Sequence, residues 1–335
     1  MASYVGAMYQ REVMNELANQ SEVVFYGPGF DGYDPEDSIK TVLVKKGGRI
    51  DAVIVGHSWL SDREGAAVDT HPNLCLQSID LPKIIILNKE YVNLDQKLAY
   101  IREMQFDLAF THHHDTKFYT NVTGTPFIFW PFAFNQNLYS AQSFSKKYDF
   151  GFSGILQNQN MAAGQGDSRI KIMRHLFHTW KDVPISKRAK YSSYRVFWNT
   201  IPRSKWQFYL ARALGRYRYL TDFAYQRIQF ETKIWLNTLS PAGLVGTRFF
   251  ECMAAQSLII CEESAHYQRI FPESCYVSFS SDLSDFEEKL NLYLENDELR
   301  REITSHAATE AWSKHTWKIR IEQFLNEVSK LAITT

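Results

Sequence analysis

Short apolar runs alternate with segments of helical spacing through the first half of the chain. The runs cover residues 22–27, 51–57, 83–88, 107–114 and 126–134, and residues 12–19 and 94–104 have the spacing of amphipathic helices. Such runs, separated by helical segments, are typical of parallel strands buried on both faces and joined by crossover helices. The pattern therefore predicts a Rossmann-like sheet in this half of the chain.

A second series of the same kind begins near residue 148. It predicts strands over residues 148–156, 232–239, 257–264 and 276–281, an amphipathic helix over 169–180, and helices from 283 to 331, the first of them with a serine N-cap. We therefore predict an α/β protein with two Rossmann-like domains, residues 1–146 and 147–312, followed by a C-terminal helix within residues 313–335.

The composition narrows the class of protein. The 335 residues include 37 basic and 37 acidic ones, which gives zero formal net charge, and 45% of the residues are hydrophobic. This balance excludes a disordered chain and disfavours wrapping of a nucleic acid, because a neutral chain has no global field to hold a polyanion. The sequence has no apolar run of membrane-spanning length, and residues 1–17 lack the features of a signal peptide.

The four cysteines also indicate the compartment. Cys75, Cys252, Cys261 and Cys275 are scattered, form no C-x-x-C pair, and lie in or near apolar stretches. We expect them to be buried free thiols in a reducing, cytoplasmic setting.

Aromatic residues make up 15% of the chain and have two interpretations. They can fill large cores, or Trp and Tyr rings can stack on the apolar faces of sugars. Between residues 187 and 227 they are interleaved with Lys and Arg. This basic-aromatic region is either a solvated face or a docking surface for an anionic glycan or for membrane headgroups, which would place the protein at the membrane periphery.

The most informative stretch follows the predicted strand 232–239. A loop containing Gly243 leads to a helix that starts near Gly246 and Thr247, where free backbone N–H groups and the helix dipole favour an anion. Arg248 can add a bidentate contact to a phosphate, and Glu251, about one turn later, can accept both hydroxyls of a ribose. These residues predict a nucleotide site. The alternative is a surface ion pair between Arg248 and Glu251.

The same stretch resembles a family pattern. The sequence Arg248-Phe-Phe-Glu251-Cys-Met-Ala-Ala-Gln256 is similar to that of group-1 glycosyltransferases of the GT-B fold, particularly the CgeB-like (spore-maturation type) branch, and the resemblance extends over residues 148–325. It implies two Rossmann-like domains facing a cleft, a C-terminal helix that crosses back to the first domain, and a ribose-binding role for Glu251. Gln256 replaces a glycine of the pattern. Gly243 stands where the larger family has a glutamate that contacts the donor sugar, so retention or inversion stays open.

A second donor-binding element is expected at Ser153 and Gly154, after the predicted strand that starts at residue 148. The resemblance implies that this turn lies against the donor phosphates, and small residues permit a close backbone approach. An ordinary glycine-containing turn is the alternative.

Candidate catalytic residues lie in the sequence Thr111-His112-His113-His114-Asp115, at the end of an apolar run. Consecutive side chains alternate in direction on an extended chain, so the three histidines cannot all face one metal ion. One of them, His112 or His114, or else Asp115, could act as a general base or hold a donor phosphate. The alternative is a polar loop with a capping side chain.

A glycine-rich loop follows the first apolar run. Gly27, Gly29 and Gly32 have G-x-G-x-x-G spacing with Asp31 inside, and His57 ends the next run. We expect Gly27, Gly29, Asp31 and His57 to contact an acceptor or a phosphate. The spacing also leaves NAD binding open, although a lone match of this kind is weak evidence.

Together these features predict a glycosyltransferase that moves a sugar from a nucleotide-sugar donor to a hydroxyl of a glycan or other acceptor. The sequence contains no D-x-D motif to hold a divalent metal on the diphosphate, so we expect metal-independent catalysis with the nucleotide-sugar as co-substrate and no cofactor. One alternative is a non-catalytic nucleotide- or glycan-binding module on the same fold. A less favoured one is an NAD-dependent oxidoreductase.

Overall fold

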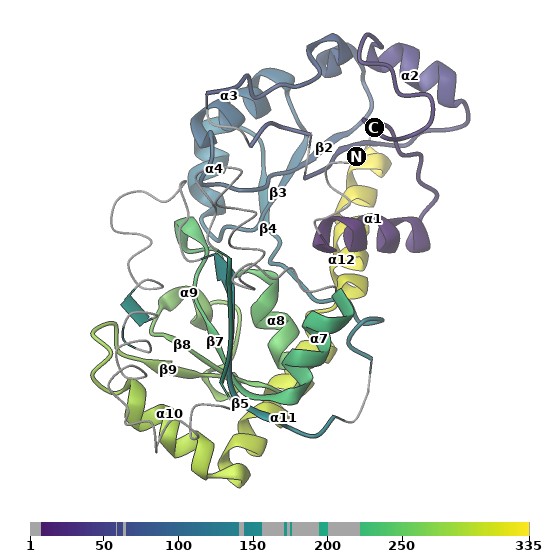
Figure 1. Cartoon of the computed structure of the whole chain (residues 1–335). Coiled ribbons are helices and arrows are strands. Elements are labelled where there is room, and N and C mark those ends of the chain that lie inside the picture. The colour runs from purple at the N-terminus through teal and green to yellow at the C-terminus, as the bar shows by residue number, and fades with distance from the viewer. Residues whose placement is uncertain are drawn as a thin grey trace, which may run out of the picture. The chain divides into compact units, whose positions relative to one another are not determined.

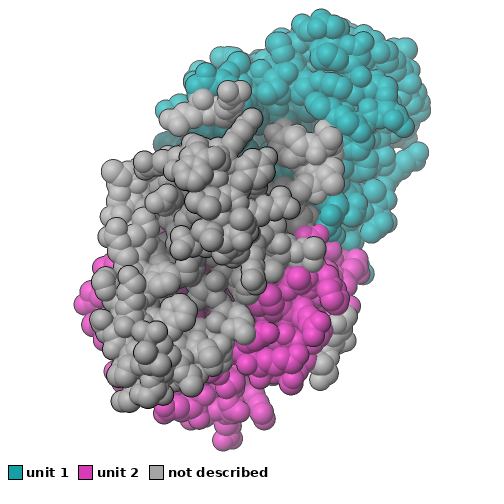
Figure 2. All heavy atoms as spheres, in the orientation of Figure 1, with its two compact units in different colours: residues 1–132, 317–335 teal, residues 133–316 magenta. Residues whose placement is uncertain are grey.

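The computed structural model describes residues 8–57, 59–62, 65–140, 144–155, 171–172, 175, 194–199 and 222–334. The chain divides into two compact units (Figure 2). Unit 1 comprises residues 1–132 and 317–335, and unit 2 comprises residues 133–316. Each unit is built on a parallel sheet, so the structure confirms the predicted α/β class with two Rossmann-like domains.

The described part of unit 1 contains a four-stranded parallel sheet in the order β1-β2-β3-β4. Every residue of β2 is buried, as expected for a central parallel strand. The strands are β1 (Val53–Val55), β2 (Lys83–Ile86), β3 (Leu108–Thr111) and β4 (Phe127–Phe129). The helices are α1 (Met8–Gln20), α2 (Ile39–Lys46), α3 (Leu94–Met104), α4 (Thr116–Thr123) and α12 (Trp317–Thr334), with short 3-10 turns at Pro72–Leu74 and Leu76–Ser78.

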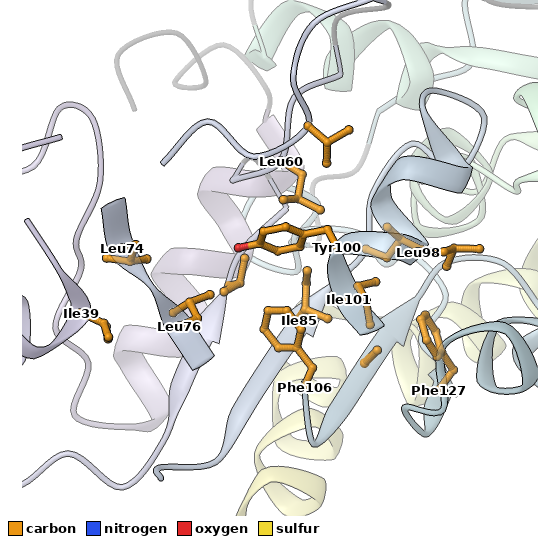
Figure 3. Packing of buried hydrophobic residues seen from close by; sticks show 14 of the residues in the cluster. Ile39, Leu60, Leu74, Leu76, Ile85, Leu98, Tyr100, Ile101, Phe106 and Phe127 are labelled. Atoms are coloured by element: carbon orange, nitrogen blue, oxygen red, sulfur yellow. The ribbon is translucent and has the colours of Figure 1, made fainter. Parts of the chain in front are cut away.

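An apolar core fills the space between the sheet of unit 1 and its helices. Figure 3 shows side chains from the loop after β1, from β2 and from α3 gathered in it, among them Leu60, Ile85 and Ile101. Ile85 and Ile101 are 1% and 0% exposed. This burial explains the periodic apolar pattern that predicted α3 with the bounds observed.

The C-terminal helix α12 belongs to unit 1, as the family resemblance implied (Figure 1). It packs against α1, and its Phe324 ring lies 4.6 Å from that of Phe110 on β3. The indole Nε1 of Trp130 donates to the backbone carbonyl of Arg320, and the Arg320 side chain donates to that of Pro131. Residues near the end of the sequence therefore complete the N-terminal unit.

The described part of unit 2 contains a five-stranded parallel sheet in the order β6-β5-β7-β8-β9. The strands are β5 (Tyr148–Ile155), β6 (Tyr194–Asn199), β7 (Thr232–Asn237), β8 (Leu258–Glu262) and β9 (Val277–Phe279). The helices are α7 (Asp222–Glu231), α8 (Thr247–Ala254), α9 (Ala265–Gln268), α10 (Phe286–Glu295) and α11 (Asp297–Lys314), with 3-10 turns at Pro241–Gly243 and Glu273–Cys275.

Three local predictions differ from the structure. Residues 22–27 form no strand, and Val24 in this run is 47% exposed. The N-cap of α10 is Asp285 instead of a serine. Cys75 is exposed, whereas the other three cysteines are buried free thiols, because Cys75 has a left-handed backbone conformation between two 3-10 turns that direct Leu74 and Leu76 inward.

Two other predictions fall mostly outside the described residues. They are the amphipathic helix over 169–180 and the basic-aromatic region 187–227 with its suggested membrane contact. Within the described part, no helix is long and apolar enough to cross a membrane.

Candidate functional site

The N-terminus of α8 lies in unit 2, where the loop after β7 ends. Gly246 is the N-cap residue, with φ −74° and ψ 168°, and no side chain of the described residues caps the helix. The backbone N–H groups at the start of α8, from Thr247 onward, therefore lack the side-chain acceptor that commonly satisfies one of them. These groups and the helix dipole together favour an anion at this point.

Glu251, one turn into α8, lies inside unit 2 and is 4% exposed. Burial raises the pKa of its carboxyl, against the opposing effects of the Arg248 charge and of hydrogen bonds from Thr247, Tyr225 and Gln229. A buried carboxylate held by so many donors forms no surface ion pair, which removes that interpretation of the Arg248–Glu251 spacing.

The Arg248 side chain reaches from α8 toward β5. Its guanidinium carbon lies 5.9 Å from the centroid of the Phe152 ring. Tyr225 hydrogen-bonds the guanidinium, but Nε of Arg248 is buried and has no hydrogen-bond partner among the described residues. A guanidinium with an unused buried donor is suited to bind phosphate or carboxylate.

Two residues of this site, Tyr225 and Gln229, were missed from the sequence. They lie one turn apart on α7, in a stretch where no clear pattern was recognised. Burial raises the pKa of the Tyr225 hydroxyl well above its ordinary value, so it is a neutral hydrogen-bonding group at pH 7. Gln229 is fully buried and accepts a hydrogen bond from the Tyr139 hydroxyl. The helix also contains Gln226, Arg227 and Glu231, so the i,i+4 spacing of Tyr225 and Gln229 gave no distinct signal.

Ser153 and Gly154 are placed in β5 and not in the turn that was expected there. Their backbones pair in register with Phe197 and Trp198 of β6. Arg248 contacts Phe152, the neighbouring residue, so β5 and α8 lie close together near this point.

In unit 1, His57 and His112 form a buried pair where β1 and β3 end. Their Nε2 atoms are 2.9 Å apart, the rings are nearly parallel, and the residues are 7% and 4% exposed. Nδ1 of His112 lies 2.7 Å from the carbonyl oxygen of Trp130. Because a carbonyl oxygen only accepts, we assign the proton of His112 to Nδ1, and His57 then donates from Nε2 to Nε2 of His112.

Aromatic rings surround this pair and keep it neutral. The ring of Phe132 stacks on His112 with centroids 3.7 Å apart, and Trp130 stacks on both imidazoles. Burial lowers the pKa of His112 to about 4 and that of His57 well below its ordinary value. At neutral pH both imidazoles are therefore neutral. The Nε2 lone pair of His112 accepts from His57, so Nδ1 of His57 carries the other lone pair of the pair.

Glu90, after β2, is a further buried residue beside the pair that was not predicted. Its Oε1 accepts hydrogen bonds from the Thr111 hydroxyl at 2.7 Å and from the backbone N–H of His112 at 2.9 Å. Its Oε2 is buried and has no hydrogen-bond partner among the described residues. The carboxylate fixes the end of β3, and its position at a strand end was the signal available in the sequence.

The other predicted residues of this segment have different surroundings. Asp115 is the N-cap of α4, and its carboxylate accepts from the backbone N–H of Phe118 at 3.3 Å. His114 is partly exposed and stacks on His113, with ring centroids 4.4 Å apart. The structure therefore brings His112 together with His57, and gives Asp115 a capping role.

The glycine-rich loop at residues 27–32 is a tight turn. Gly27, Gly29 and Gly32 have φ values of 144°, 92° and 75°, and the N–H of Phe30 donates to the carbonyl of Gly27. Lys46 donates to the backbone carbonyl of Asp31 at 3.0 Å. A dinucleotide fingerprint needs a strand before the glycines and a helix opening at them. Residues 8–26 form no strand and α2 begins only at Ile39, so the geometry does not support NAD binding.

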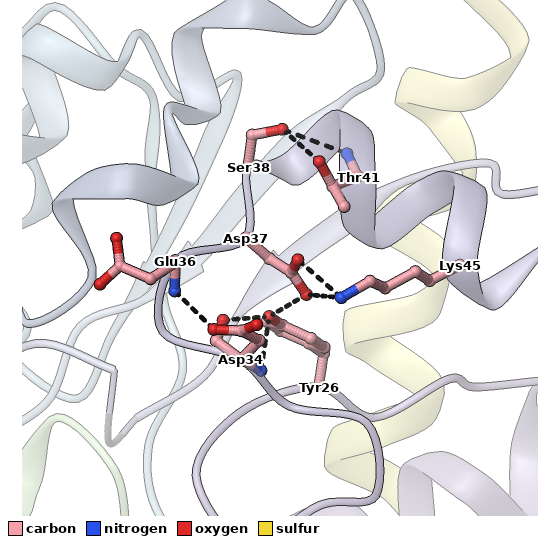
Figure 4. Close-up of polar contacts among 7 residues, drawn as sticks. All are labelled: Tyr26, Asp34, Glu36, Asp37, Ser38, Thr41 and Lys45. Carbon is pink, nitrogen blue, oxygen red and sulfur yellow. Dashed lines mark hydrogen bonds and ion pairs between the residues drawn. The ribbon is translucent and has the colours of Figure 1, made fainter.

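A set of polar contacts holds both ends of this loop (Figure 4). Lys45 of α2 contacts both carboxylate oxygens of Asp37 at 2.7 Å, which lowers the pKa of that carboxyl. The Tyr26 hydroxyl contacts Asp37 at 3.1 Å and the backbone of Asp34 at 2.8 Å, and Ser38 caps α2. The loop is thus fixed to α2 from both sides.

The buried histidine pair predicts a pH-dependent stability. The pKa of His112 is about 4 in the folded protein and 6.5 without the fold, so the unfolded chain binds more protons between these values. The free energy of unfolding should therefore fall as pH decreases from 6.5 to 4, by about 3 kcal/mol from His112 alone. Chemical denaturation at several pH values should show a flatter profile for His112→Asn. An unchanged profile would contradict a buried, neutral His112.

Comparison with known protein families finds a match over the C-terminal half of the chain. Residues 174–326 match a family described as glycosyl transferase-like. No curated protein sequence matches the chain significantly.

Within the described residues no group of three or more His, Cys, Asp or Glu side chains could hold a metal ion.

Solved structures share the fold at low sequence identity. Sucrose-phosphate synthase from Thermosynechococcus elongatus has a TM-score of 0.54 at 10% identity, over 77% of this chain and 70% of that one. An E. coli trehalose-6-phosphate protein bound to UDP-2-fluoroglucose has a TM-score of 0.55 at 10% identity, over 87% of this chain and 75% of that one. TarM of S. aureus in complex with UDP has a TM-score of 0.50 at 12% identity, over 78% of this chain and 52% of TarM. The chain therefore spans about half the length of TarM. This likeness shows the GT-B fold.

Proposed function

We propose that this protein transfers a sugar from a nucleotide-sugar to a hydroxyl of a glycan or other acceptor. Residues 174–326 match the glycosyl transferase-like family, and the chain has a GT-B fold. The observation that carries the proposal is the N-terminus of α8, which no described side chain caps, with the partly buried Arg248 and the buried Glu251 beside it.

The donor is assigned to the C-terminal domain, residues 147–312. Its diphosphate binds the N–H groups after Gly246 and the Arg248 guanidinium, while Glu251 accepts the ribose hydroxyls in exchange for its contacts with α7. Ser153 and Gly154 complete the donor site from β5. UDP-glucose is the first donor to test, because two of the similar structures contain UDP or a UDP-sugar.

The acceptor is assigned to the N-terminal domain, residues 1–146, with the His57–His112 pair as general base. In an inverting reaction the acceptor hydroxyl gives its proton to the pair, its oxygen bonds to the anomeric carbon, and the bond from that carbon to the diphosphate breaks. In a retaining reaction the donor phosphate takes the proton instead. His114, Asp115 and the loop with Gly27, Gly29 and Asp31 are candidate acceptor contacts.

Transfer is proposed to be independent of metal. Arg248 and the dipole of α8 would stabilise the leaving diphosphate in place of a divalent cation. We expect the purified protein to release UDP from UDP-glucose in the presence of an acceptor, and to keep its rate in excess EDTA. Loss of activity in EDTA, restored by manganese or magnesium, would contradict metal independence and leave the transferase proposal intact.

The competing proposal is a nucleotide- or glycan-binding module without catalysis. Gln256 and Gly243, the two departures from the family pattern, favour it. Such a module would bind nucleotide-sugars without releasing the nucleoside diphosphate, so the same assay separates the two.

A further inference from the structure

The loop between β7 and α8 packs against a histidine of α9, the short helix that follows β8. Ala242 and Gly243 have φ values of 60° and 74°, and the N–H of Ser240 donates to the carbonyl of Leu244 at 2.8 Å, which closes the loop. A Cβ atom built on Gly243 would lie 2.5 Å from both Cε1 and Nε2 of His266. No side chain at position 243 fits while this ring is in place, so the imidazole fills the space that such a side chain would occupy.

His266 is held in this position by its own segment. It lies on α9, directly after β8, and its backbone N–H donates to the hydroxyl of Ser264, the N-cap of that turn. β8 is the neighbour of β7 in the sheet, so both segments leave the same carboxyl edge. Ligands of open parallel sheets bind at this edge, and the N-terminus of α8 begins three residues after Gly243.

The chemistry of His266 suits a neutral polar ligand. The ring is partly exposed, and burial of the rest lowers its pKa below the ordinary value, so it is uncharged at pH 7. Nδ1 of the ring is buried, so Nε2 is the nitrogen that would meet a ligand, and a sugar hydroxyl can pair with Nε2 in either tautomer because it both donates and accepts. It adds no positive charge to a phosphate site.

We propose that His266 contacts the hydroxyls of the sugar carried by the nucleotide donor, and so helps to position that sugar at the start of α8. The inference rests on the proposed function, because it takes the donor to bind at α8. It assigns to His266 a role in recognising the sugar, while Arg248 and Glu251 hold the nucleotide and its phosphates.

The test compares two probes, UDP-glucose and UDP, on the full-length chain by titration calorimetry. His266→Ala should weaken UDP-glucose binding about three- to tenfold, the effect of one lost hydrogen bond, and leave UDP affinity within about twofold. His266→Asn should restore part of the loss. His306→Ala, which removes an exposed histidine of α11, is the matched control and should change neither affinity.

Each other outcome has a distinct meaning. Equal affinities of wild type and His266→Ala for UDP-glucose would overturn this inference and leave the proposed donor site standing. Equal losses for UDP and UDP-glucose would also overturn it, because the ring would then support the loop and not the sugar. If the wild-type protein binds neither probe, the proposed UDP-sugar donor fails together with the inference.

Discussion

Replacing His112 by Asn should reduce turnover by at least about a hundredfold with little change in donor affinity. A positioned general base contributes roughly 10²–10⁴-fold to a rate. His112 and His57 form the one buried imidazole pair among the described residues, and burial keeps both uncharged at neutral pH. We expect His57→Asn to have a similar effect, since each ring orients the other through the Nε2–Nε2 contact. Initial rates at saturating donor are the measurement.

The neighbouring residues provide matched controls. His114→Asn removes a partly exposed imidazole from the same segment, and Asp115→Asn keeps a side chain that can cap α4. Both should lose much less turnover than His112→Asn, because a lost acceptor contact costs less than a lost general base. If His57→Asn and His112→Asn fold, bind donor and keep near-normal rates, the base lies elsewhere, and His114 and Asp115 become the first residues to examine. Equal loss of donor binding in all four variants would indicate a structural role for the segment.

The second large effect is expected at Glu251. Glu251→Gln keeps the shape of the side chain but removes the charge that would accept the two ribose hydroxyls. Hydrogen bonds to a charged group contribute about 1.5–3 kcal/mol each, so affinity for UDP should fall at least about tenfold. Arg248→Met should weaken UDP binding to a similar extent and should barely affect binding of uridine, which has no diphosphate. Titration calorimetry with UDP and uridine measures both.

A second buried glutamate of unit 2 controls for loss of stability. Glu231 is 3% exposed and pairs with Lys147 and Arg227 at the end of α7, away from the N-terminus of α8. Glu231→Gln should destabilise the unit without changing UDP affinity. A Glu251→Gln protein that is folded and binds UDP like the wild type would contradict the ribose-binding assignment. Glu251 would then act only through its contacts within unit 2, with Arg248, Thr247, Tyr225 and Gln229.

The elements that could be predicted from the sequence are those whose pattern is set locally. The spacing of apolar residues predicted α3 with its observed bounds. The glycine-containing loop followed by a helical pattern predicted that α8 starts near Gly246. Residues 22–27 show the limit of this reasoning, because an apolar, β-branched run needs a neighbouring strand to become one. This run has no such neighbour among the described residues.

The sites depend on contacts between distant segments, which no local pattern contains. His57 and His112 end strands that are separated by β2 in the sheet, so their contact requires the strand order as well as the register. The apposition of His266 and Gly243 requires two consecutive residues with positive φ. The sequence predicts that His57 and His112 lie at strand ends, but their contact with each other is seen only in the folded structure.

The most direct test of the donor site is the shift in melting temperature across a panel of nucleotide-sugars, with NAD included. A ligand that binds only the folded protein stabilises it by about 2.7 kcal/mol at a concentration of 100 times its Kd. We predict that at least one nucleotide-sugar raises the melting temperature of the wild-type protein, that Glu251→Gln loses most of this shift, and that NAD has no effect. A shift with NAD and none with any nucleotide-sugar would contradict the nucleotide-sugar site at α8.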